Sequence, residues 1–411
     1  MDAHEFTLRP VTDDELPAFF EAEQTAFGET SDPAELEHSR KLIELDRTLA
    51  AFEGDRIVAT AGVYSFELTV PGLRQLKAAG VTAVGVLPTH RRRGILTSLM
   101  ARQLDDVAAR GEPLAILTAS EGGIYGRFGY GAAIFFRKVD VNTRQARPAR
   151  PAQAPGRVLL LDKAEAAKLL PAVYDQVRRA TVGAVSRTEA WWTELLRDPE
   201  HHRGGHGRRF DAVHERAPGE ADGYVTYRIE QRWIEQQPRS ILHLDELCAV
   251  DDEVHAALWE YLLGVDLVET VRAYVPVDDP MPWRLADARQ FHTTRTGEHI
   301  WARVLDVPAA LAGRAWAADG RLVLRVEDSF RPSSGGTFDL DVANGSAQVG
   351  RTGDAPDLVL GASELGSLYL GGVAWRDLGR AGRVTERTPG SLERADRIFA
   401  THPAPWSTTD F

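Results

Sequence analysis

The residues best suited to chemistry form a basic turn between a short apolar run and an amphipathic segment. The apolar run ends at Pro88, and Arg91, Arg92, Arg93 and Gly94 follow. Free backbone N–H groups at a helix start, together with the helix dipole, form an anion site. Arginines add charge and bidentate donors to phosphate oxygens, and glycine lets the backbone approach closely. The order of strand, basic turn and helix predicts a site for the pyrophosphate of a nucleotide-derived cofactor.

The spacing of this turn separates it from other phosphate-binding motifs. It contains neither the G-x-G-x-x-G of dinucleotide-binding folds nor the G-x-x-x-x-G-K-[ST] of P-loops. It resembles the [QR]-x-x-G-x-[GA] pattern of GNAT acyltransferases, in which Arg91 and Gly94 match and Leu96 departs from the last small residue. For three adjacent arginines alone, the alternative is an exposed basic helix start that binds nothing.

A second segment, 119–131, is rich in glycine and tyrosine and follows a strand expected over 114–118. We expect Phe128 and Tyr130 to fill the core. We interpret Tyr125 as functional, because a tyrosine at this place in GNAT enzymes protonates the departing CoA thiolate. The chemistry is reasonable, since a phenol of pKa about 10 can hydrogen-bond to or protonate a thiolate whose thiol has a pKa of about 8.5.

The strings Pro-Thr-His-Arg-Arg-Arg-Gly and Ser-Glu-Gly-Gly-Ile-Tyr-Gly-Arg-Phe-Gly-Tyr-Gly together resemble the enhanced intracellular survival (Eis) acetyltransferase family. The likeness covers essentially the whole chain. It implies a mixed α/β (α+β) fold with two tandem GNAT-like domains and a third domain like sterol carrier protein. We expect an N-terminal GNAT domain over 1–145, a degenerate GNAT-like domain over 156–290 and the third domain over 291–411.

The resemblance also implies the site. In the family, acetyl-CoA lies along one strand, the basic turn and the residues after the next strand. These positions are Val84, Gly85, Val86, Arg91, Arg92, Arg93, Gly94, Ile95, Leu96, Thr97, Ser120 and Glu121. Tyr125 matches the general acid. The general base of the family is the carboxylate of the last residue, here Phe411.

A terminal carboxylate has a physical logic as a base. A primary amine has a pKa of about 10.4, so it is protonated at neutral pH and must lose a proton before it attacks a thioester. A carboxylate attracts the cation and then accepts the proton directly or through water. A frayed, solvated tail is the usual state of a C-terminus. Trp406 and Phe411 favour docking instead, because an aromatic end prefers a buried position.

The resemblance implies an acetyl-CoA-dependent N-acetyltransferase that acts on primary amines. The acceptor is a cationic small molecule of the aminoglycoside type, or a lysine side chain, and the transfer is direct because no cysteine or catalytic triad lies near the turn. Glu21 and Glu23 could line an amine pocket, although a solvated helix face is the simpler interpretation. The alternative function is a non-catalytic acyl-CoA-binding or lipid-binding protein. The resemblance further implies a homo-hexamer.

Composition narrows the class of partner. The chain has 411 residues, 48 Lys and Arg against 60 Asp and Glu, and a net charge of -12. Such a chain suits cationic partners and binds nucleic acid poorly. A single cysteine, Cys248, indicates a reducing compartment. The acidic start at 1–5 shows no signal peptide, and no run approaches the roughly 18 apolar residues of a membrane span. We expect a cytoplasmic protein without a metal, and secretion without a classical signal stays open.

The elements that must position this chemistry occur twice. In the first copy, strands are expected over 49–52, 57–64, 65–70, 80–86 and 114–118, a helix from Gly94, and a final strand over 134–141; the Pro-rich segment 144–155 is a linker. In the second copy, the strand 246–249 corresponds to 83–86. There Asp251-Asp252-Glu253 replaces the three arginines. This charge inversion predicts that the second copy has lost the cofactor.

Overall fold

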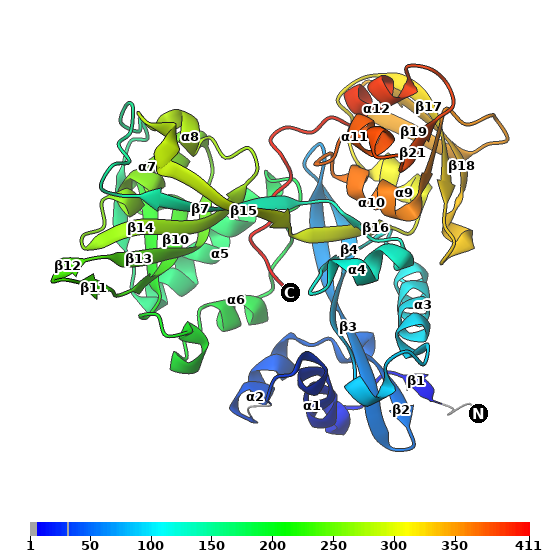
Figure 1. Cartoon of the computed structure of the whole chain (residues 1–411), viewed down its shortest axis with the longest axis horizontal. Coiled ribbons are helices and arrows are strands. Elements are labelled where there is room, and N and C mark those ends of the chain that lie inside the picture. Colours follow the sequence, from blue (N-terminus) through cyan, green and yellow to red (C-terminus); the bar gives the residue numbers. More distant parts are fainter. Residues whose placement is uncertain (1–5, 31–32) are drawn as a thin grey trace. The chain divides into compact units, whose positions relative to one another are not determined.

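The computed structural model describes residues 6–30 and 33–411, so the acidic start at 1–5 lies outside the described residues. The chain forms two compact units (Figure 1). Unit 1 comprises residues 1–134, 299–402 and 409–411, and unit 2 comprises residues 135–298 and 403–408. Each unit contains a seven-stranded sheet, and unit 1 also contains a five-stranded sheet. Among the described residues, no helix is long and apolar enough to cross a membrane.

The seven-stranded sheet of unit 1 has the order β1-β2-β3-β4-β5-β16-β6. Its strands are β1 (Thr7–Arg9), β2 (Leu49–Glu53), β3 (Arg56–Val70), β4 (Arg74–Val86), β5 (Leu114–Thr118), β16 (Ile300–Val304) and β6 (Gly131–Ala132). Its helices are α1 (Leu16–Phe27), α2 (Pro33–Leu42), α3 (Ile95–Ala109) and α4 (Gly122–Tyr125), with 3-10 turns at 13–15, 45–47, 88–90 and 126–128.

Helix α3 shows how the apolar pattern builds this sheet layer. The predicted face of α3 is buried, with Leu99, Met100 and Leu104 fully covered. These side chains pack in clusters with residues of the sheet strands, and they remove several large apolar groups from water. The burial anchors the helix, so its first turn is held at a defined place after β4.

The second sheet of unit 1 is the smaller one, with the order β19-β18-β17-β20-β21. Its elements are β17 (Gly320–Glu327), β18 (Gly336–Ala343), β19 (Ser346–Arg351), β20 (Leu358–Gly361), β21 (Val384–Glu386), α9 (Val307–Gly313), α10 (Ala362–Tyr369), α11 (Trp375–Arg380), α12 (Ser391–Phe399) and a 3-10 turn at 332–334. Trp316 and Trp375 pack edge-on against Phe399 at the core. Ser363 of α10 donates a hydrogen bond to the carbonyl of Tyr130, which ties this part to the edge of the first sheet.

Unit 2 contains a sheet of the same kind, with the order β15-β7-β14-β13-β10-β9-β8. Its strands are β7 (Phe135–Asn142), β8 (Arg157–Leu160), β9 (Phe210–Ala217), β10 (Glu220–Glu230), β13 (Ser240–Ala249), β14 (Val268–Pro276) and β15 (Phe291–Glu298), and β11 (Trp233–Ile234) pairs with β12 (Gln237–Pro238) in a separate hairpin. Its helices are α5 (Lys163–Arg179), α6 (Glu189–Leu195), α7 (Asp252–Leu263) and α8 (Met281–Arg284), with 3-10 turns at 200–203 and 288–290.

Two strands lie in other sheets than the sequence predicts. The strand expected over 134–141 to end the first sheet is β7, which pairs with β14 and β15 in unit 2. The segment from 291, expected in the third domain, divides: β15 stays in unit 2, and β16 pairs with β5 and β6 of unit 1. An alternating strand has a buried face but does not specify its partner. The sheets therefore do not change at 145 and 291, and the three domain extents stay predictions.

Candidate active site

The central feature of unit 1 is the place where β4 and β5 separate. The two strands pair in parallel only from Ala78–Leu114 to Gly80–Ile116. Beyond Gly80, β4 continues to Val86 beside β3, while β5 continues to Thr118 beside β16. The β5-facing backbone edge of residues 81–86 thus leaves the ladder, although it still carries N–H and C=O groups. Such an edge can pair with the amide groups of an extended ligand.

A β-bulge shapes this part of β4. The register with β3 shifts between Thr60–Gly85 and Gly62–Thr82, which inserts one extra residue in β4. Ala83 has a left-handed backbone (φ 51°), and its carbonyl accepts a hydrogen bond of 2.8 Å from the Thr60 hydroxyl. Gly85 is also constrained, since a Cβ there would lie 2.8 Å from that of Ala26 on α1. The predicted strand 84–86 is therefore bent at the point where it leaves β5.

The basic turn opens directly onto the start of α3. Arg92 (φ 64°) and Gly94 (φ 81°) both have left-handed backbones. Gly94 is the N-cap residue, and no side chain caps this helix. The first helical hydrogen bond runs from Ser98 N to Gly94 O, so the N–H groups of residues 95–97 precede it. These groups and the helix dipole favour an anion.

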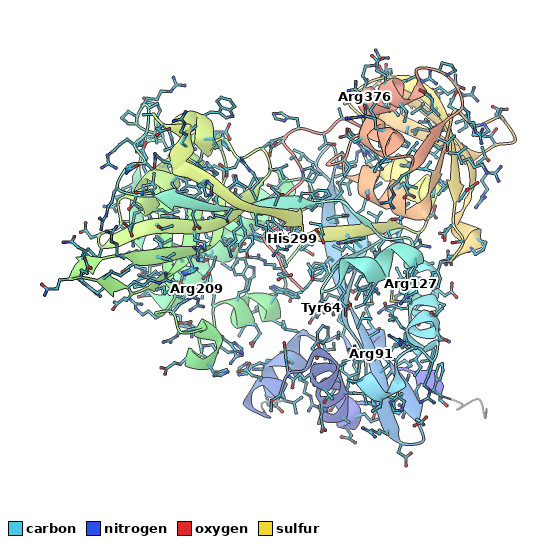
Figure 2. All side chains as sticks on the ribbon, viewed as in Figure 1. Tyr64, Arg91, Arg127, Arg209, His299 and Arg376 are labelled. Carbon is cyan, nitrogen blue, oxygen red and sulfur yellow. The ribbon has the colours of Figure 1, made fainter. Side chains whose placement is uncertain are left out.

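The three arginines of the turn are not equivalent. Arg93 binds Glu53 at 2.9 Å, and Glu53 also contacts His90 at 3.1 Å. These hydrogen bonds, first that of His90 and then that of Arg93, hold the pKa of Glu53 below its usual value. Arg91 reaches the carbonyl of Ala26 at 3.4 Å (its position is labelled in Figure 2). In the described part of the chain, the Arg92 side chain has no partner, so it is the arginine most available to a phosphate.

Ser120 and Glu121 lie at the same edge of the sheet as the turn. They follow β5 directly and are exposed, and Glu121 precedes α4. Because β4 and β5 are parallel where they pair, the segments that follow them leave at the same edge. The predicted cofactor positions thus come from the ends of two separating strands.

Tyr125 ends α4 and is buried, with 7 % of its surface exposed. Its ring packs edge-on against Tyr130 at 6.0 Å. Burial, and then the charge of Glu121, raises the pKa of Tyr125, so its hydroxyl keeps its proton at neutral pH. Tyr130 and Phe128 are fully buried, which confirms the prediction that these two rings fill the core.

The C-terminal residue docks where β4 and β5 separate. Thr118, the last residue of β5, donates a hydrogen bond of 2.6 Å from Oγ1 to a terminal oxygen of Phe411. The Phe411 ring packs edge-on against Phe66 of β3 at 4.9 Å. A Cβ at Gly80 would lie 2.3 Å from the Phe66 ring and 3.2 Å from that of Phe411, so glycine makes room for both. The end of the chain is docked rather than frayed.

The sequence left open whether Glu21 and Glu23 line an amine pocket. Glu21 is exposed, but Glu23 is half-buried on α1. Burial, and then the charge of Glu29, raises the pKa of Glu23 to about 7. Glu23 in turn helps burial to raise the pKa of Tyr64 to about 12. The Tyr64 ring neighbours that of Phe66, which packs against Phe411, so two rings connect Glu23 to Phe411.

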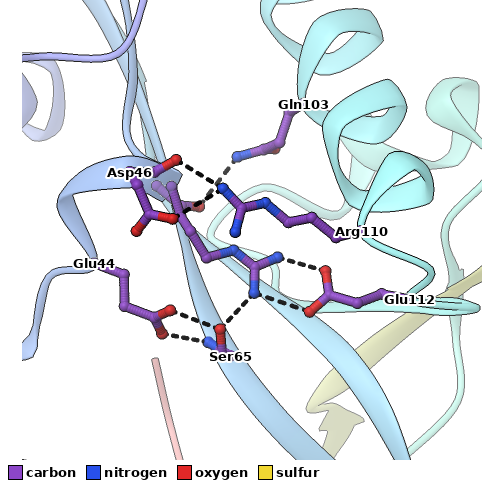
Figure 3. A network of polar contacts seen from close by, with 8 residues as sticks. Glu44, Asp46, Ser65, Gln103, Arg110 and Glu112 are labelled. Atoms are coloured by element: carbon purple, nitrogen blue, oxygen red, sulfur yellow. Dashed lines mark hydrogen bonds and ion pairs between the residues drawn. The ribbon is translucent and has the colours of Figure 1, made fainter.

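A polar network holds the part of β3 that carries these rings (Figure 3). Glu44 accepts hydrogen bonds of 2.6 Å from both the N–H and the hydroxyl of Ser65. Arg47 donates to the Ser65 hydroxyl at 2.6 Å and to Glu112 at 2.9 Å. Arg47 and Glu112 are both buried, so losing either would leave an uncompensated charge. Ser65, between Tyr64 and Phe66, is therefore rigidly placed.

The corresponding helix start in unit 2 is closed. Asp251 caps α7, and its Oδ1 accepts hydrogen bonds from the N–H groups of Glu253 (3.0 Å) and Val254 (2.9 Å). Glu253 binds Arg284 at 2.7 Å. A carboxylate of the chain itself thus occupies the position that α3 leaves open to an anion.

The structure gives one histidine partners that the sequence did not indicate, and it adds residues to the site that carry no sequence motif. His206, for which the sequence offers no ligand-spaced partner, stacks on His243 at 4.1 Å, and His243 contacts Glu230 at 3.1 Å. The prediction of a metal-free protein is therefore not tested by the fold. Thr118, Phe66 and Tyr64 were not predicted, because a threonine and two aromatic residues in strands carry no motif.

Three family models match the chain. An acetyltransferase (GNAT) domain matches residues 7–133, a second acetyltransferase (GNAT) domain matches residues 183–304, and a sterol carrier protein domain matches residues 307–408. The predicted class, two GNAT-like domains followed by a sterol-carrier-protein-like domain in a mixed fold of helices and strands, is confirmed.

Relatives match over nearly the full length. An uncharacterized N-acetyltransferase of Streptomyces coelicolor is 41 % identical over 389 residues, which are 93 % of this chain and 94 % of the relative. The N-acetyltransferase Eis of Mycobacterium tuberculosis is 34 % identical over 405 residues, 96 % of this chain and 97 % of that protein. The crystal structure of Eis1 from Mycobacterium abscessus, at 35 % identity, superposes with a TM-score of 0.88 and covers 98 % of this chain and 100 % of its own.

Proposed function

Because the chain belongs to the Eis-like family of N-acetyltransferases, we propose that it transfers the acetyl group of acetyl-CoA directly to a primary amine. The acceptor is a cationic small molecule of the aminoglycoside type, or a lysine side chain. The observation that carries the proposal is the terminal carboxylate of Phe411, held by Thr118 where β4 and β5 separate.

Acetyl-CoA supplies the activated acetyl thioester, and residues already described fit its parts. The open N–H groups of 95–97 and the unpartnered Arg92 suit its phosphates. The bent, unpaired edge of β4 over 81–86 suits the amides of its pantetheine arm. Ser120 and Glu121 follow β5, on the other side of the separation between β4 and β5. These roles, including those of Val84, Gly85 and Val86, are proposals.

The acceptor side is acidic, as a cationic substrate requires. The Phe411 carboxylate, bonded to Thr118, and Glu23, coupled to Tyr64, offer negative charge. Aromatic faces also attract ammonium groups. We assign Glu23 to amine binding, and the interpretation of Glu23 as a solvated residue is replaced because the side chain is half-buried.

Proton transfer is divided between two groups. The Phe411 carboxylate accepts a proton from the bound ammonium, directly or through water, so that the amine becomes a nucleophile. Tyr125 keeps its proton at neutral pH, because burial raises its pKa, and it donates that proton to the departing thiolate. The described residues offer no cysteine nucleophile here, since Cys248 is buried in unit 2.

Release of CoA thiol is the direct test. Purified protein is incubated with acetyl-CoA and a panel of an aminoglycoside, a polyamine and a lysine peptide, and thiol is followed with a colorimetric reagent. Cys248 is buried and its thiol pKa is raised well above the usual value by burial and then by Glu246, so the protein contributes little background. Thiol release that depends on an amine supports the proposal. Acetyl-CoA binding without release with any amine would favour the alternative, a non-catalytic acyl-CoA-binding or lipid-binding protein.

Two further proposals concern the oligomeric state and the cellular location. The family resemblance supports a homo-hexamer, which light scattering on the purified protein tests. The single cysteine supports a reducing compartment and hence a cytoplasmic location. Fractionation of cells and medium tests that location.

A further inference from the structure

Two parallel strands also separate in the related sheet of unit 2. Its strands β13 and β14 pair in parallel from Ser240 to Leu244 and then part. Beyond that point β13 stays beside β10 and β14 beside β7, as β4 and β5 stay beside β3 and β16. A register shift between Thr226 and Tyr227 of β10 bulges β13 at this place. Unit 2 therefore retains the gap that unit 1 is proposed to use for acetyl-CoA.

A buried ion pair forms on the part of β13 that has left β14. Glu246 lies on the separated part of β13, and Arg187 binds it in a bidentate manner at 2.8 and 3.2 Å. Tyr224 donates a further hydrogen bond of 2.6 Å to Glu246. Burial disfavours the charge on Glu246, but Arg187 outweighs it and holds the pKa of Glu246 below its usual value. The carboxylate is therefore charged and satisfied.

The aromatic surroundings of Arg187 fix its direction. Its guanidinium lies over the rings of Tyr174 at 3.9 Å and Trp192 at 5.1 Å. The Tyr174 hydroxyl is itself tied to the carbonyl of Val185 at 2.8 Å. Arg187, Tyr174 and Trp192 together line part of a cavity of about 720 Å³. Arg187 is thus a pre-oriented donor rather than a mobile surface charge.

A residue of the C-terminal tail, Thr408, contacts both members of this ion pair. Arg187 donates to Thr408 Oγ1 at 3.4 Å, and the Thr408 hydroxyl also bonds Glu246 and helps to lower its pKa. Two earlier tail residues are held by unit 2 as well. Trp406 N donates to the carbonyl of Val182 at 2.8 Å, and Ala404 N donates to Asp278 at 2.7 Å. Only two residues separate Thr408 from Phe411 in the chain.

From these contacts we infer that Arg187, Glu246 and Thr408 form a clamp that positions the C-terminal carboxylate for catalysis. The degenerate GNAT-like unit thus keeps the separation of its strands, and Glu246 of the separated strand, together with Arg187, holds the tail. The three are positioning residues, since they act through the backbone of residues 409–411. The functional part of this inference rests on the proposed role of Phe411, whereas the holding of the tail does not.

The test uses the full chain and two kinds of variant. Thr408→Val removes one hydroxyl at nearly constant volume. The double variant Arg187→Met, Glu246→Met replaces the ion pair by apolar side chains and leaves no unpaired buried charge. Thr193→Val is the matched control, because Thr193 is an exposed threonine of α6 outside the clamp. Thermal unfolding verifies that each variant is folded.

Carboxypeptidase digestion, followed by intact mass, measures how firmly the tail is held. We expect Phe411 to be released about 3- to 10-fold faster from Thr408→Val and more than 10-fold faster from the double variant, with Thr193→Val unchanged. The kcat for acetyl transfer should fall by similar factors while the KM for acetyl-CoA stays constant, and Thr408→Ser should restore both. With Phe411 deleted, the clamp variants should cause no further loss of kcat.

Release of Phe411 at the wild-type rate from both folded variants would overturn the clamp. Faster release with an unchanged kcat would confirm that the tail is held but overturn its positioning role. If deletion of Phe411 itself left kcat unchanged, the terminal base would fail, and the release rates would still decide whether unit 2 holds the tail.

Discussion

The N-termini of α3 in unit 1 and α7 in unit 2 follow related strands, but only the N-terminus of α3 is open to an anion. The N-terminus of α3 begins at Gly94, has no side-chain cap and is preceded by three arginines. The N-terminus of α7 is capped by Asp251, which accepts two hydrogen bonds from the helix. A carboxylate of the chain itself thus closes, in one unit, the kind of helix start that the other unit leaves open to an anion.

The strand gaps differ in the same manner. In unit 1 the gap between β4 and β5 ends at Thr118 and the Phe411 carboxylate. In unit 2 the part of β13 beyond its pairing with β14 carries Glu246, which forms a buried ion pair with Arg187. We propose that the first separation serves the substrate, whereas the second carries an ion pair whose Arg187 binds Thr408 of the tail.

The largest effect is expected at the end of the chain. Deletion of Phe411 removes the carboxylate from Thr118 and should lower kcat by about 10²- to 10⁴-fold, the usual range for loss of a general base. Phe411→Leu keeps a terminal carboxylate and should retain most of the activity. Steady-state kinetics measures both, and acetyl-CoA binding should persist. Equal activity of the deletion and the wild type would remove Phe411 from the mechanism.

Next in size is the conversion of the α3 start into the α7 type. Gly94→Asp places a carboxylate at the open N-terminus and should raise the KM for acetyl-CoA about 10- to 100-fold, because the new charge competes with phosphate. Gly94→Asn is the matched control, since asparagine also tolerates a left-handed backbone and is uncharged. Similar KM values for the two variants would show that this helix start does not hold the cofactor.

A third prediction contrasts two carboxylates. Glu246 is paired and its pKa is lowered, whereas burial and then Glu29 raise the pKa of Glu23 to about 7. The KM for a cationic acceptor should therefore fall about tenfold between pH 6 and 8, as Glu23 ionises. Glu23→Gln should flatten this profile and leave the KM for acetyl-CoA unchanged. A wild-type profile in Glu23→Gln would exclude Glu23 from amine binding.

Glu23 should also affect stability. Its folded pKa of about 7 exceeds the ordinary value of 4.5, so the folded state binds more protons between these values. The contribution of Glu23 to the free energy of unfolding should hence fall as pH rises through this interval. In Glu23→Gln, denaturant titrations should show a smaller fall over the same pH range.

A smaller effect separates the arginines. Arg92→Gly removes the unpartnered charge, keeps the left-handed backbone and should raise the KM for acetyl-CoA about fivefold, equivalent to about 1 kcal/mol. Arg93→Met should change this KM less, because Arg93 already binds Glu53. A larger effect of Arg93→Met would reverse the ranking of the two side chains.

The smallest effect on catalysis is expected in unit 2. Asp251→Ala removes the cap of α7 and should lower the free energy of unfolding by about 1 kcal/mol, as loss of an N-cap usually does. The KM for acetyl-CoA should stay constant. Chemical denaturation measures the first quantity and kinetics the second. A changed KM would mean that unit 2 still binds the cofactor.

The sequence predicts the local parts of this site and not the distant ones. The Arg91–Gly94 turn, the α3 face and the core positions of Phe128 and Tyr130 depend on neighbouring residues, so their pattern is visible in the chain. The contact between Thr118 and Phe411 joins residues 293 positions apart. Only the resemblance to a family pointed to Phe411, and nothing pointed to Thr118.

The exchange of strands shows the same limit. The strand expected over 134–141 forms as β7 but pairs with β14 of unit 2, and β16, which was not predicted, pairs with β5 of unit 1. Alternation reports which face is buried, whereas the partner is decided by edges that form elsewhere in the chain. The raised pKa of Glu23 likewise comes first from burial on α1, which the sequence pattern does not show, and then from Glu29.

Calorimetric titration of acetyl-CoA into the wild-type protein tests most directly whether one helix start is open and the other closed. The open N-terminus of α3 and the Asp251 cap of α7 predict one site per chain. Two sites per chain, or one site that survives unchanged in Gly94→Asp, would contradict it.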